Sequence, residues 1–430
     1  MSVSTRKVAA RDFSFADVVR RGDHIMWPQG TGEPTGLTAA LMAQAESLPP
    51  LDLVLGMVTT NTLDRLPVHF GFLCLSGAAN TRKAAARSGN RIIPAHVSMI
   101  PGLLETRRIP VDIALIRVRP TDDPNIVALG GMVDFVHEMV GAARVVIAEW
   151  DERLPLTGAD ALIERSLITH WVEADRAEPE MVDAVPSEID RKVAEQVAKL
   201  IPDRATVQFG IGGMPVAVAG ALSGHRDLGL HSGVIPDAVI DLIASGVITN
   251  AYKGIDLGVS VTGGLFGTKR LFDFAHRNDA LAMRKARHTH VGATMARLAN
   301  FYSVNSAIAI DLTGQVNSEI AGGRYLGAVG GQPDFVRGAR LSAGGRSIMA
   351  LASTTHDGKH SKIVADLGSQ PVTTARSDID LVVTEYGAAD LWGLDLAGRA
   401  QALIEIAHPD FRDSLSRTLM QPAQKERAIA

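Results

Sequence analysis

The sequence predicts an α/β fold in which largely parallel sheets are flanked by helices. Three observations lead to this prediction. Apolar runs of strand length alternate with helix-length segments along the whole chain. Residues 51–57 are almost continuously apolar, as expected of a strand buried on both faces, and residues 111–118 are the clearest strand of the first half. An acidic, proline-containing stretch at residues 175–187 then interrupts the pattern, and this break predicts two domains, residues 1–180 and 181–430.

The first half is expected to begin with a loosely attached stretch, residues 1–11. Asn80 is placed to act as the N-cap of one of the helices expected there. The expected helices are residues 15–21, 36–45 and 80–88, with a loop containing Gly30, Gly32 and Gly36 after His24. The expected strands are residues 51–57, 111–118, 127–131 and 143–149, with a further helix between the last two.

The second half is expected to begin with a helix from Ser187, its N-cap, to residue 200. A strand at residues 206–209 then enters a glycine turn, and Pro215 suits the first turn of the helix that follows. A strand at residues 228–231 and a helix opened by Pro236 come next. Further strands are expected at residues 247–250, 260–262, 307–311, 347–351 and 379–384. Two such halves suggest a tandem duplication, although no clean repeat is visible.

Composition narrows the class of protein. The formal net charge of −4 over 430 residues gives no indication of nucleic acid or an anionic membrane as a partner. The lone cysteine, Cys74, excludes an intrachain disulfide and any cysteine-rich metal site. No secretory leader or membrane span is recognisable. We therefore expect a soluble cytoplasmic protein.

Two glycine-rich turns are the candidates for a ligand site. The first is Gly210-Ile211-Gly212-Gly213 followed by Met214, and the second runs from Gly322 to Gly331. A strand that feeds glycines and then a helix leaves backbone N–H groups free to hold an anion or an oxyanion. The alternative is that these glycines only form tight turns, and the sequence leaves both interpretations open.

Several common sites are not supported. The first turn lacks the third glycine of a dinucleotide fingerprint, and no P-loop, HExxH or GxSxG motif occurs around these turns. His288 and His290 are expected on an exposed loop, so no metal site is predicted. A set of basic residues could serve a phosphorylated ligand, namely Arg82, Lys83, Lys253, Lys269, Arg270, Arg324, Arg337 and Arg340.

The ordered motifs resemble the acetyl-CoA hydrolase/transferase family, including its 4-hydroxybutyrate CoA-transferase branch. The likeness covers nearly the whole chain. The motifs are GEPTGL, NTRKA, PVDIALIRVRP, GIGGMP, SVNSAIAIDLTGQVNSE, GGQPDFVRGA, VVTEYG and RAQALIEIAHPDFR. The resemblance implies two CoA-transferase-type domains, each an open twisted and mostly parallel sheet flanked by helices, and a homodimer.

The resemblance also implies a reaction. In this family a glutamate attacks an acyl-CoA thioester, an anhydride forms, and CoA then attacks it to give a glutamyl-CoA thioester. The first turn, Gly210 to Met214, and the second, at Gly330 and Gly331, would hold the oxyanion and line the pantetheine channel. CoA would be a substrate, with no permanently bound cofactor.

This chain departs from the family at the nucleophile. The family motif H-[ST]-E matches His231-Ser232-Gly233, and Gly233 has no side chain. One explanation is a substitute carboxylate, with Glu319 as the first candidate and Glu105 and Glu385 as weaker ones.

A second explanation is hydrolysis by a water in the vacated volume, oriented by His231, Ser232 or Glu319. A third is acyl-CoA binding without turnover. The expected function is CoA transfer between an acyl-CoA and a small carboxylic acid, with these two as alternatives.

Overall fold

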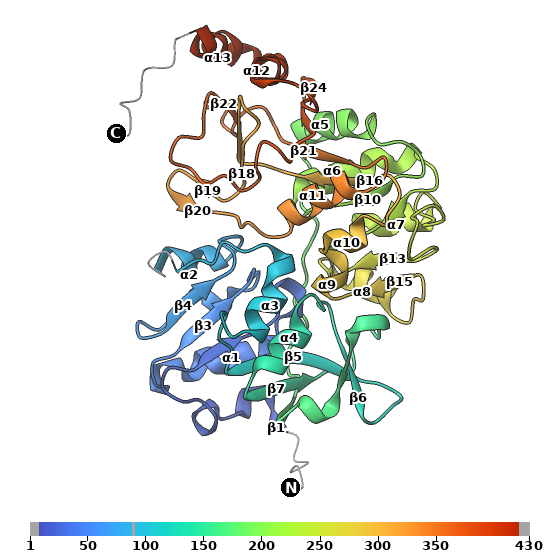
Figure 1. Cartoon of the computed structure of the whole chain (residues 1–430). Coiled ribbons are helices and arrows are strands. Elements are labelled where there is room, and N and C mark those ends of the chain that lie inside the picture. The colour runs from blue at the N-terminus through green and yellow to red at the C-terminus, as the bar shows by residue number, and fades with distance from the viewer. Residues whose placement is uncertain (1–7, 88–90, 421–430) are drawn as a thin grey trace.

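Two large sheets organise the computed structural model, which describes residues 8–87 and 91–420 (Figure 1). The first sheet uses strands between Val8 and Glu173 and lies in the lower half of Figure 1. The second uses strands between Thr206 and Asp390 and lies in the upper half. Both are predominantly parallel and flanked by helices, which confirms the predicted fold class. Within the described ranges, no helix is both long and apolar enough to cross a membrane.

The first sheet has the strand order β1-β9-β7-β5-β2-β3-β4. Neighbours along this path are parallel, and β6 joins β5 antiparallel and carries β8. The strands are β1 (Val8–Ala9), β2 (His24–Met26), β3 (Asp52–Leu55), β4 (Gly71–Cys74), β5 (Ile113–Pro120), β6 (Ile126–Leu129), β7 (Val145–Trp150), β8 (Leu162–Glu164) and β9 (His170–Glu173).

The second sheet has the order β11-β10-β16-β21-β23-β24, and only β24 runs antiparallel to its neighbour. Its strands are β10 (Thr206–Gln208), β11 (Gly229–Leu230), β16 (Phe301–Asn305), β21 (Arg346–Ala350), β23 (Leu381–Thr384) and β24 (Gly387–Asp390). Small sheets use β12 (Val234–Ile235), β13 (Ser260–Thr262), β14 (Gly264–Leu265), β15 (Leu281–Met283), β17 (Ala309–Asp311), β18 (Val316–Asn317), β19 (Ile320–Ala321), β20 (Arg324–Tyr325) and β22 (Ile363–Val364).

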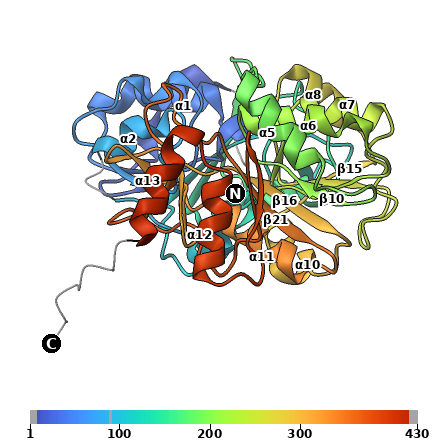
Figure 2. The same ribbon diagram turned by 90° about the horizontal axis from the view of Figure 1, so that it is seen from above.

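Helices cover the sheets, and α12 and α13 lie at the outer end of the second half (Figures 1 and 2). The helices of the first half are α1 (Thr35–Gln44), α2 (Thr81–Arg87), α3 (Ile100–Glu105) and α4 (Val136–Ala142). Those of the second half are α5 (Glu188–Ala198), α6 (Gly213–Ala221), α7 (Ala238–Ala244), α8 (Lys269–Ala275), α9 (Ala286–Thr289), α10 (Gly292–Met295), α11 (Gln332–Leu341), α12 (Leu396–Glu405) and α13 (Pro409–Met420).

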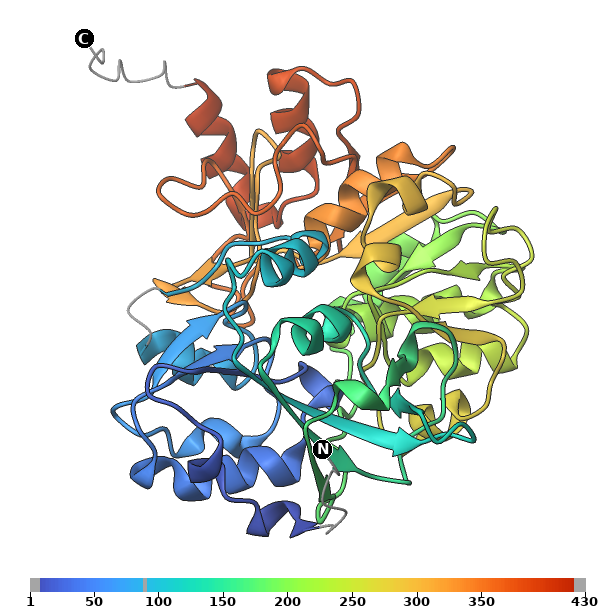
Figure 3. The same cartoon turned by 60° about the horizontal axis from the view of Figure 1, so that its bottom comes forward.

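The two halves pack against each other through a shared core. The largest cluster of buried apolar side chains includes Met132 of the first half and Leu265 of the second. The contact is close, since a Cβ on Gly264 would lie 2.5 Å from the Cε of Met132. Figure 3 shows the two halves side by side from a third direction. This packing places the loops that follow the strands of one half against those of the other.

Several predicted elements are present near their expected bounds. Ser187 caps α5 with a reciprocal capping box to Asp190, which confirms the predicted N-cap. On α5, Val193 and Val197 are buried while Ile189 is exposed. Of the stretch expected to be loosely attached, residues 1–7 lie outside the described residues, and β1 follows them. Residue 88, the expected end of the third helix, also lies outside them.

Other predictions of local structure are wrong. Residues 247–250 form a single bridge between Leu228 and Ile248, because Asn250 adopts φ +58° and its side chain accepts the N–H of Leu230 at 2.8 Å. Residues 15–21 contain only one 3-10 turn, Phe15–Asp17. Strands β2 and β16 were not expected. In β16 the buried polar side chain of Asn305 donates to Gln208 at 3.0 Å. Such a polar residue made this central strand unrecognisable from its sequence.

Candidate functional site

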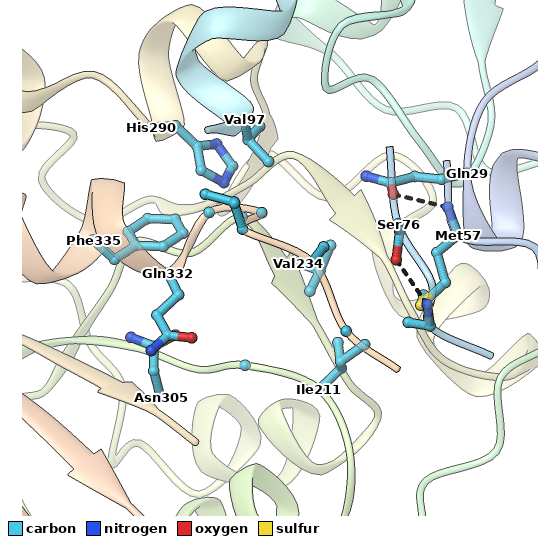
Figure 4. A pocket seen from close by; sticks show the side chains of 18 of the residues that line it. Gln29, Met57, Ser76, Val97, Ile211, Val234, His290, Asn305, Gln332 and Phe335 are labelled. Carbon is cyan, nitrogen blue, oxygen red and sulfur yellow. Dashed lines mark hydrogen bonds between the residues drawn. The ribbon is translucent and has the colours of Figure 1, made fainter. Parts of the chain in front are cut away.

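Both glycine turns border one cleft between the two halves, with a volume of about 390 Å³ (Figure 4). Gly210 and Ile211 line it from the first turn, and Gly330 and Gly331 line it from the second. Gly233 also lines it, whereas Gly212, Gly213 and Met214 are not among its lining residues. The size falls in the range of small-molecule sites.

Each turn is the N-terminus of a helix. Gly212, at φ +101°, is the N-cap of α6, and Gly331 is the N-cap of α11; neither helix has a side-chain cap. The first backbone N–H groups of a helix have no partner within the helix, and the helix dipole makes this end positive. The glycines therefore leave two helix N-termini near the cleft without side chains over them. Such groups can stabilise an oxyanion or a thiolate.

The second turn is fixed to the first half of the chain. The N–H of Val97 donates to the carbonyl of Gly330 at 3.1 Å, and His96 and Gly330 form a parallel bridge. The carboxylate of Asp334 accepts the N–H of Ser98 at 3.0 Å and its hydroxyl at 2.6 Å, and it contacts His96 Nδ1 at 3.2 Å. The cleft is therefore built by both halves, and its geometry depends on their docking.

The volume beside Gly233 is filled by His290. A Cβ on Gly233 would lie 2.8 Å from both Cε1 and Nε2 of that ring, and a Cβ on Gly331 would lie 2.6 Å from Nε2. The prediction of a vacated volume is therefore wrong. The prediction that His290 lies on an exposed loop is also wrong, because the side chain is buried and follows α9. Figure 4 shows its ring next to Phe335 at the edge of the cleft.

His290 is hydrogen-bonded to the neighbouring Thr289. The Thr289 hydroxyl donates to the carbonyl of Lys285 at 3.3 Å and lies 2.8 Å from His290 Nδ1. The hydroxyl and Nδ1 can exchange the donor and acceptor roles, and Nε2 faces Gly233 and Gly331. Burial lowers the pKa of His290 to about 4, against a smaller opposing effect of Asp334. The ring is therefore neutral at pH 7 and can accept a proton or a hydrogen bond.

Asp134 is the acidic side chain among the described residues that line the cleft. Its Oδ2 accepts a hydrogen bond from Gln29 Nε2 at 2.9 Å, while its buried Oδ1 has no partner among the described groups. Burial raises the pKa of Asp134 to about 7; the Gln29 hydrogen bond opposes this, and the charges of Glu138 and Asp334 add to it. A buried carboxyl with a perturbed pKa in a cleft is a typical candidate for chemistry.

Sequence reasoning did not identify Asp134 or His290 as site residues, although the sequence contains a signal for the first. Gly130-Gly131-Met132-Val133-Asp134-Phe135-Val136 matches Gly330-Gly331-Gln332-Pro333-Asp334-Phe335-Val336 at every position except the third and fourth. The short repeat contributes to the cleft in both copies, through Asp134, Phe135 and the second glycine turn. A search for short repeats could have paired the two segments.

Glu319 has a different environment from the cleft residues. Its side chain is buried, one carboxylate oxygen accepts the hydroxyl of Tyr325, and the other accepts that of Thr373 at 2.8 Å. It is not among the residues that line the cleft. Glu105 is an exposed partner of Arg287, and Glu385 accepts the N–H and the hydroxyl of Ser353.

His231 lies in a second polar cluster behind the cleft. Its Nε2 donates to the carbonyl of Thr289 at 3.0 Å, so the buried Nδ1 is an acceptor, and it has no partner among the described groups. One ligand atom each of His231, Asp256 and His288 come within 4.8 Å of one another, an arrangement that could hold a metal ion. Burial, and then the charge of Lys253, lowers the pKa of His231 to about 3, and burial lowers the pKa of Lys253 itself to about 7.

The basic residues proposed for a phosphorylated ligand do not line the cleft, as far as the described residues show. Lys253 is fully buried, and its Nζ donates to the carbonyl of Val259 at 2.6 Å. Arg337 pairs with Asp378 at 2.7 Å on the surface. Lys253 and Arg337 are therefore engaged within the protein, and the cleft itself is mainly apolar.

The chain is similar to known CoA-transferases and to acetyl-CoA hydrolase/transferase family models. The family model "Acetyl-CoA hydrolase/transferase N-terminal domain" matches residues 5–193, and the corresponding C-terminal model matches residues 267–419. The chain is 36% identical over 403 residues to the 4-hydroxybutyrate coenzyme A transferase of Clostridium kluyveri, covering 92% of this chain and 94% of that protein.

It is also 33% identical over 414 residues to the butyryl-CoA:acetate CoA-transferase of Anaerostipes caccae, covering 93% and 92% of the two chains. The crystal structure of 4-hydroxybutyrate CoA-transferase from Porphyromonas gingivalis superposes with a TM-score of 0.82 at 30% identity. That match covers 96% of this chain and 97% of the other.

Proposed function

Because the chain belongs to the acetyl-CoA hydrolase/transferase family, we propose that it moves CoA between an acyl-CoA and a small carboxylic acid. The observation that carries the proposal is the single cleft bordered by two uncapped helix N-termini, those of α6 and α11. The mainly apolar walls suit an acyl chain and the pantetheine arm of CoA. CoA is a substrate here, and the reaction requires no permanently bound cofactor.

The glycines at these helix starts have a defined role in this proposal. Gly210 and Ile211 of the first turn and Gly330 and Gly331 of the second hold the thioester end of CoA, and their N–H groups stabilise the oxyanion formed when its carbonyl is attacked. A side chain at Gly331 would meet His290 at 2.6 Å and Phe335 at 3.2 Å. The glycine therefore leaves room for the two rings that pack beside the second turn.

Acyl-CoA hydrolysis is the second candidate function, and one observation favours it. His290 Nε2 lies beside Gly233, the position at which the related enzymes are expected to carry their nucleophile. A neutral imidazole at this place could take a proton from a water that attacks the thioester. Binding of acyl-CoA without turnover is the third possibility, and a turnover assay separates it from the other two.

The test uses the named substrates of the relatives. Purified protein is incubated with butyryl-CoA and acetate, or with acetyl-CoA and 4-hydroxybutyrate, and the CoA species are followed by liquid chromatography and mass spectrometry. Formation of the acceptor's CoA ester, dependent on the acceptor, is the expected result. Release of free CoA at the same rate without an acceptor would indicate hydrolysis, and unchanged acyl-CoA with every pair would contradict both activities.

Three coarser features complete the proposal. The family likeness supports a homodimer, which light scattering after size-exclusion chromatography would test. The lone buried Cys74 suits a reduced, cytoplasmic protein, which fractionation of the source cells would test. The boundary between residues 1–180 and 181–430 is supported by the gap between β9 and β10, and limited proteolysis should cleave in that gap.

A further inference from the structure

The cleft contains two ionisable side chains among the described residues that line it, Asp134 and His290. A CoA-transferase needs a carboxylate that can take up the acyl group and then CoA. Gly233 cannot supply it, and a longer side chain there would collide with the buried His290 ring. The carboxylates of Glu319 and Glu385 are held by hydroxyls or backbone N–H groups, and neither residue lines the cleft. Asp134 is left as the carboxylate of the cleft.

The side chain of Asp134 is held as a nucleophile requires. Gln29 accepts the N–H of Met57 through Oε1 at 3.4 Å, so its amide nitrogen faces Asp134 and donates to Oδ2 at 2.9 Å. Figure 4 shows the contact between Gln29 and Met57 at one side of the cleft. The other oxygen, Oδ1, is buried without a partner among the described groups. One oxygen is therefore oriented by a hydrogen bond, and the other keeps its lone pairs free.

The backbone ties Asp134 to Gly233 through one intermediate residue. The N–H of Gly263 donates to the carbonyl of Gly233 at 2.9 Å. The carbonyl of Gly263 in turn accepts the N–H groups of Val133 at 2.9 Å and Asp134 at 3.3 Å. The carbonyl of Asp134 accepts the N–H of Ala286, the first residue of α9, which leads to His290. The three residues are thus fixed relative to one another.

The backbone of Asp134 is strained. Its φ of +30° lies in a region that residues with a Cβ seldom occupy. Strain of this kind costs of the order of 1–3 kcal/mol and persists where the surrounding structure imposes it, often at functional sites. At Asp134 this strain and the unpartnered oxygen occur in a residue that lines the cleft.

The equivalent residue of the short repeat has the opposite environment. Asp334 occupies the same position in Gly-Gly-x-x-Asp-Phe-Val, and its two oxygens are engaged by the N–H and hydroxyl of Ser98 and by His96. That carboxylate joins the two halves of the chain. The contrast shows that the motif does not itself require an unpartnered carboxyl oxygen.

We propose that Asp134 supplies the carboxylate that attacks the thioester, in place of the side chain absent at Gly233. This inference rests on the proposed function of CoA transfer. The ionised carboxylate of Asp134 forms a bond to the acyl carbonyl carbon, the C–S bond breaks, and CoA leaves as the thiolate. The product is an acyl-aspartyl anhydride. The thiolate then attacks the aspartyl carbonyl, which releases the first carboxylate and leaves an aspartyl-CoA thioester.

The second half of the reaction reverses these steps. The acceptor carboxylate attacks the aspartyl thioester and expels the CoA thiolate, which forms a new acyl-aspartyl anhydride. The thiolate then attacks the acyl carbonyl of that anhydride, and Asp134 leaves as the carboxylate. Two thioester bonds are broken and two are formed over the cycle, and no other reactant is consumed.

The first experiment traps the intermediate on the wild-type protein. The protein is incubated with butyryl-CoA without an acceptor, treated with hydroxylamine or borohydride, digested, and mapped by mass spectrometry. A hydroxamate or an alcohol at Asp134 is the expected result. Modification of a different carboxylate, or acceptor-dependent CoA transfer with no modified carboxylate, would overturn the inference while the proposed function stands. No CoA transfer by the wild-type protein would overturn both.

The second experiment uses variants with matched chemistry. Asp134→Asn keeps the shape of the side chain and removes the nucleophile, so we expect CoA transfer to fall at least about a thousandfold. Glu105→Gln makes the same change on the exposed surface, and both activity and adduct should persist. His290→Gln should retain the adduct at Asp134. The assignment would be contradicted if Asp134→Asn transferred CoA at a near-normal rate, or if the adduct were lost only in His290→Gln. Circular dichroism would verify that each variant is folded.

Discussion

The contact between Gly233 and His290 gives a prediction about stability that is independent of catalysis. Gly233→Ala adds one methyl group at a backbone conformation that alanine can adopt, since φ at this residue is not in the left-handed region. The new Cβ would lie 2.8 Å from two atoms of the His290 ring. The ring cannot move freely, because it is buried, packs against Phe335 at 4.6 Å between centroids, and is hydrogen-bonded to Thr289.

The magnitude follows from two opposing effects. Overpacking of a buried site costs about 1–3 kcal/mol. Replacing glycine by alanine at a compatible backbone conformation stabilises by about 0.4–1 kcal/mol through the unfolded chain. We therefore expect Gly233→Ala to destabilise the wild-type protein by up to about 2.6 kcal/mol. In a His290→Ala background the collision is absent, and the same substitution should be stabilising by about 0.4–1 kcal/mol.

The assay is a double-mutant cycle. The wild-type protein, both single variants and the double variant are unfolded in urea, and the free energy of unfolding is followed by circular dichroism. The expected coupling energy between the two sites is about 1–3 kcal/mol, the size of the removed collision. If the changes in unfolding free energy of the two single variants sum to that of the double variant within about 0.5 kcal/mol, the ring does not occupy this volume and the reasoning is refuted.

The same contact decides how a glutamate could be introduced. Gly233→Glu alone should destabilise the protein and gain no activity, because its side chain meets His290. Gly233→Glu combined with His290→Ala provides room for the carboxylate. If this double variant carries a CoA adduct at residue 233 while the single variant does not, the cleft is otherwise competent. An active single variant would contradict the steric argument.

Three further predictions follow from the cleft. Gly331→Val should lower kcat/KM for CoA transfer by more than about tenfold, because even the Cβ would lie 2.6 Å from His290 Nε2; unchanged steady-state kinetics would mean that the turn does not approach the ligand. Burial raises the pKa of Asp134 to about 7, and the charges of Glu138 and Asp334 add to this effect. Because the ionised carboxylate is the nucleophile, kcat/KM should fall about tenfold per pH unit below pH 7, where His290 is still neutral. A decrease of kcat/KM that begins only near pH 4 would instead indicate that His290 titrates. Because the folded protein holds the Asp134 proton more tightly than the unfolded chain, its stability should decrease as pH rises from about 4 to 7, by up to about 4 kcal/mol. Asp134→Asn should remove this slope in urea denaturation, and an unaltered slope would contradict the burial of an ionised carboxylate.

Much of the local structure could be predicted from the sequence, because it depends on short-range patterns. The capping box at Ser187 and strand β5 follow from residue type and spacing. The central strand β16 could not be predicted, because its polar residue Asn305 is compatible with burial only through its hydrogen bond to Gln208 on the neighbouring strand. Residues 247–250 resemble a strand locally, but the conformation of Asn250 turns the chain.

The sequence by itself determined the α/β class, the two glycine turns, the family and the absence of a side chain at Gly233, because each of these is a property of residues near one another in the chain. Only the tertiary structure decided that His290 fills the space beside Gly233 and that Asp134 borders the same cleft. These residues come from segments far apart in sequence, and hydrogen bonds through Gly263 and α9 bring them together. The identity of the groups that surround a substrate is therefore set by how the two halves dock.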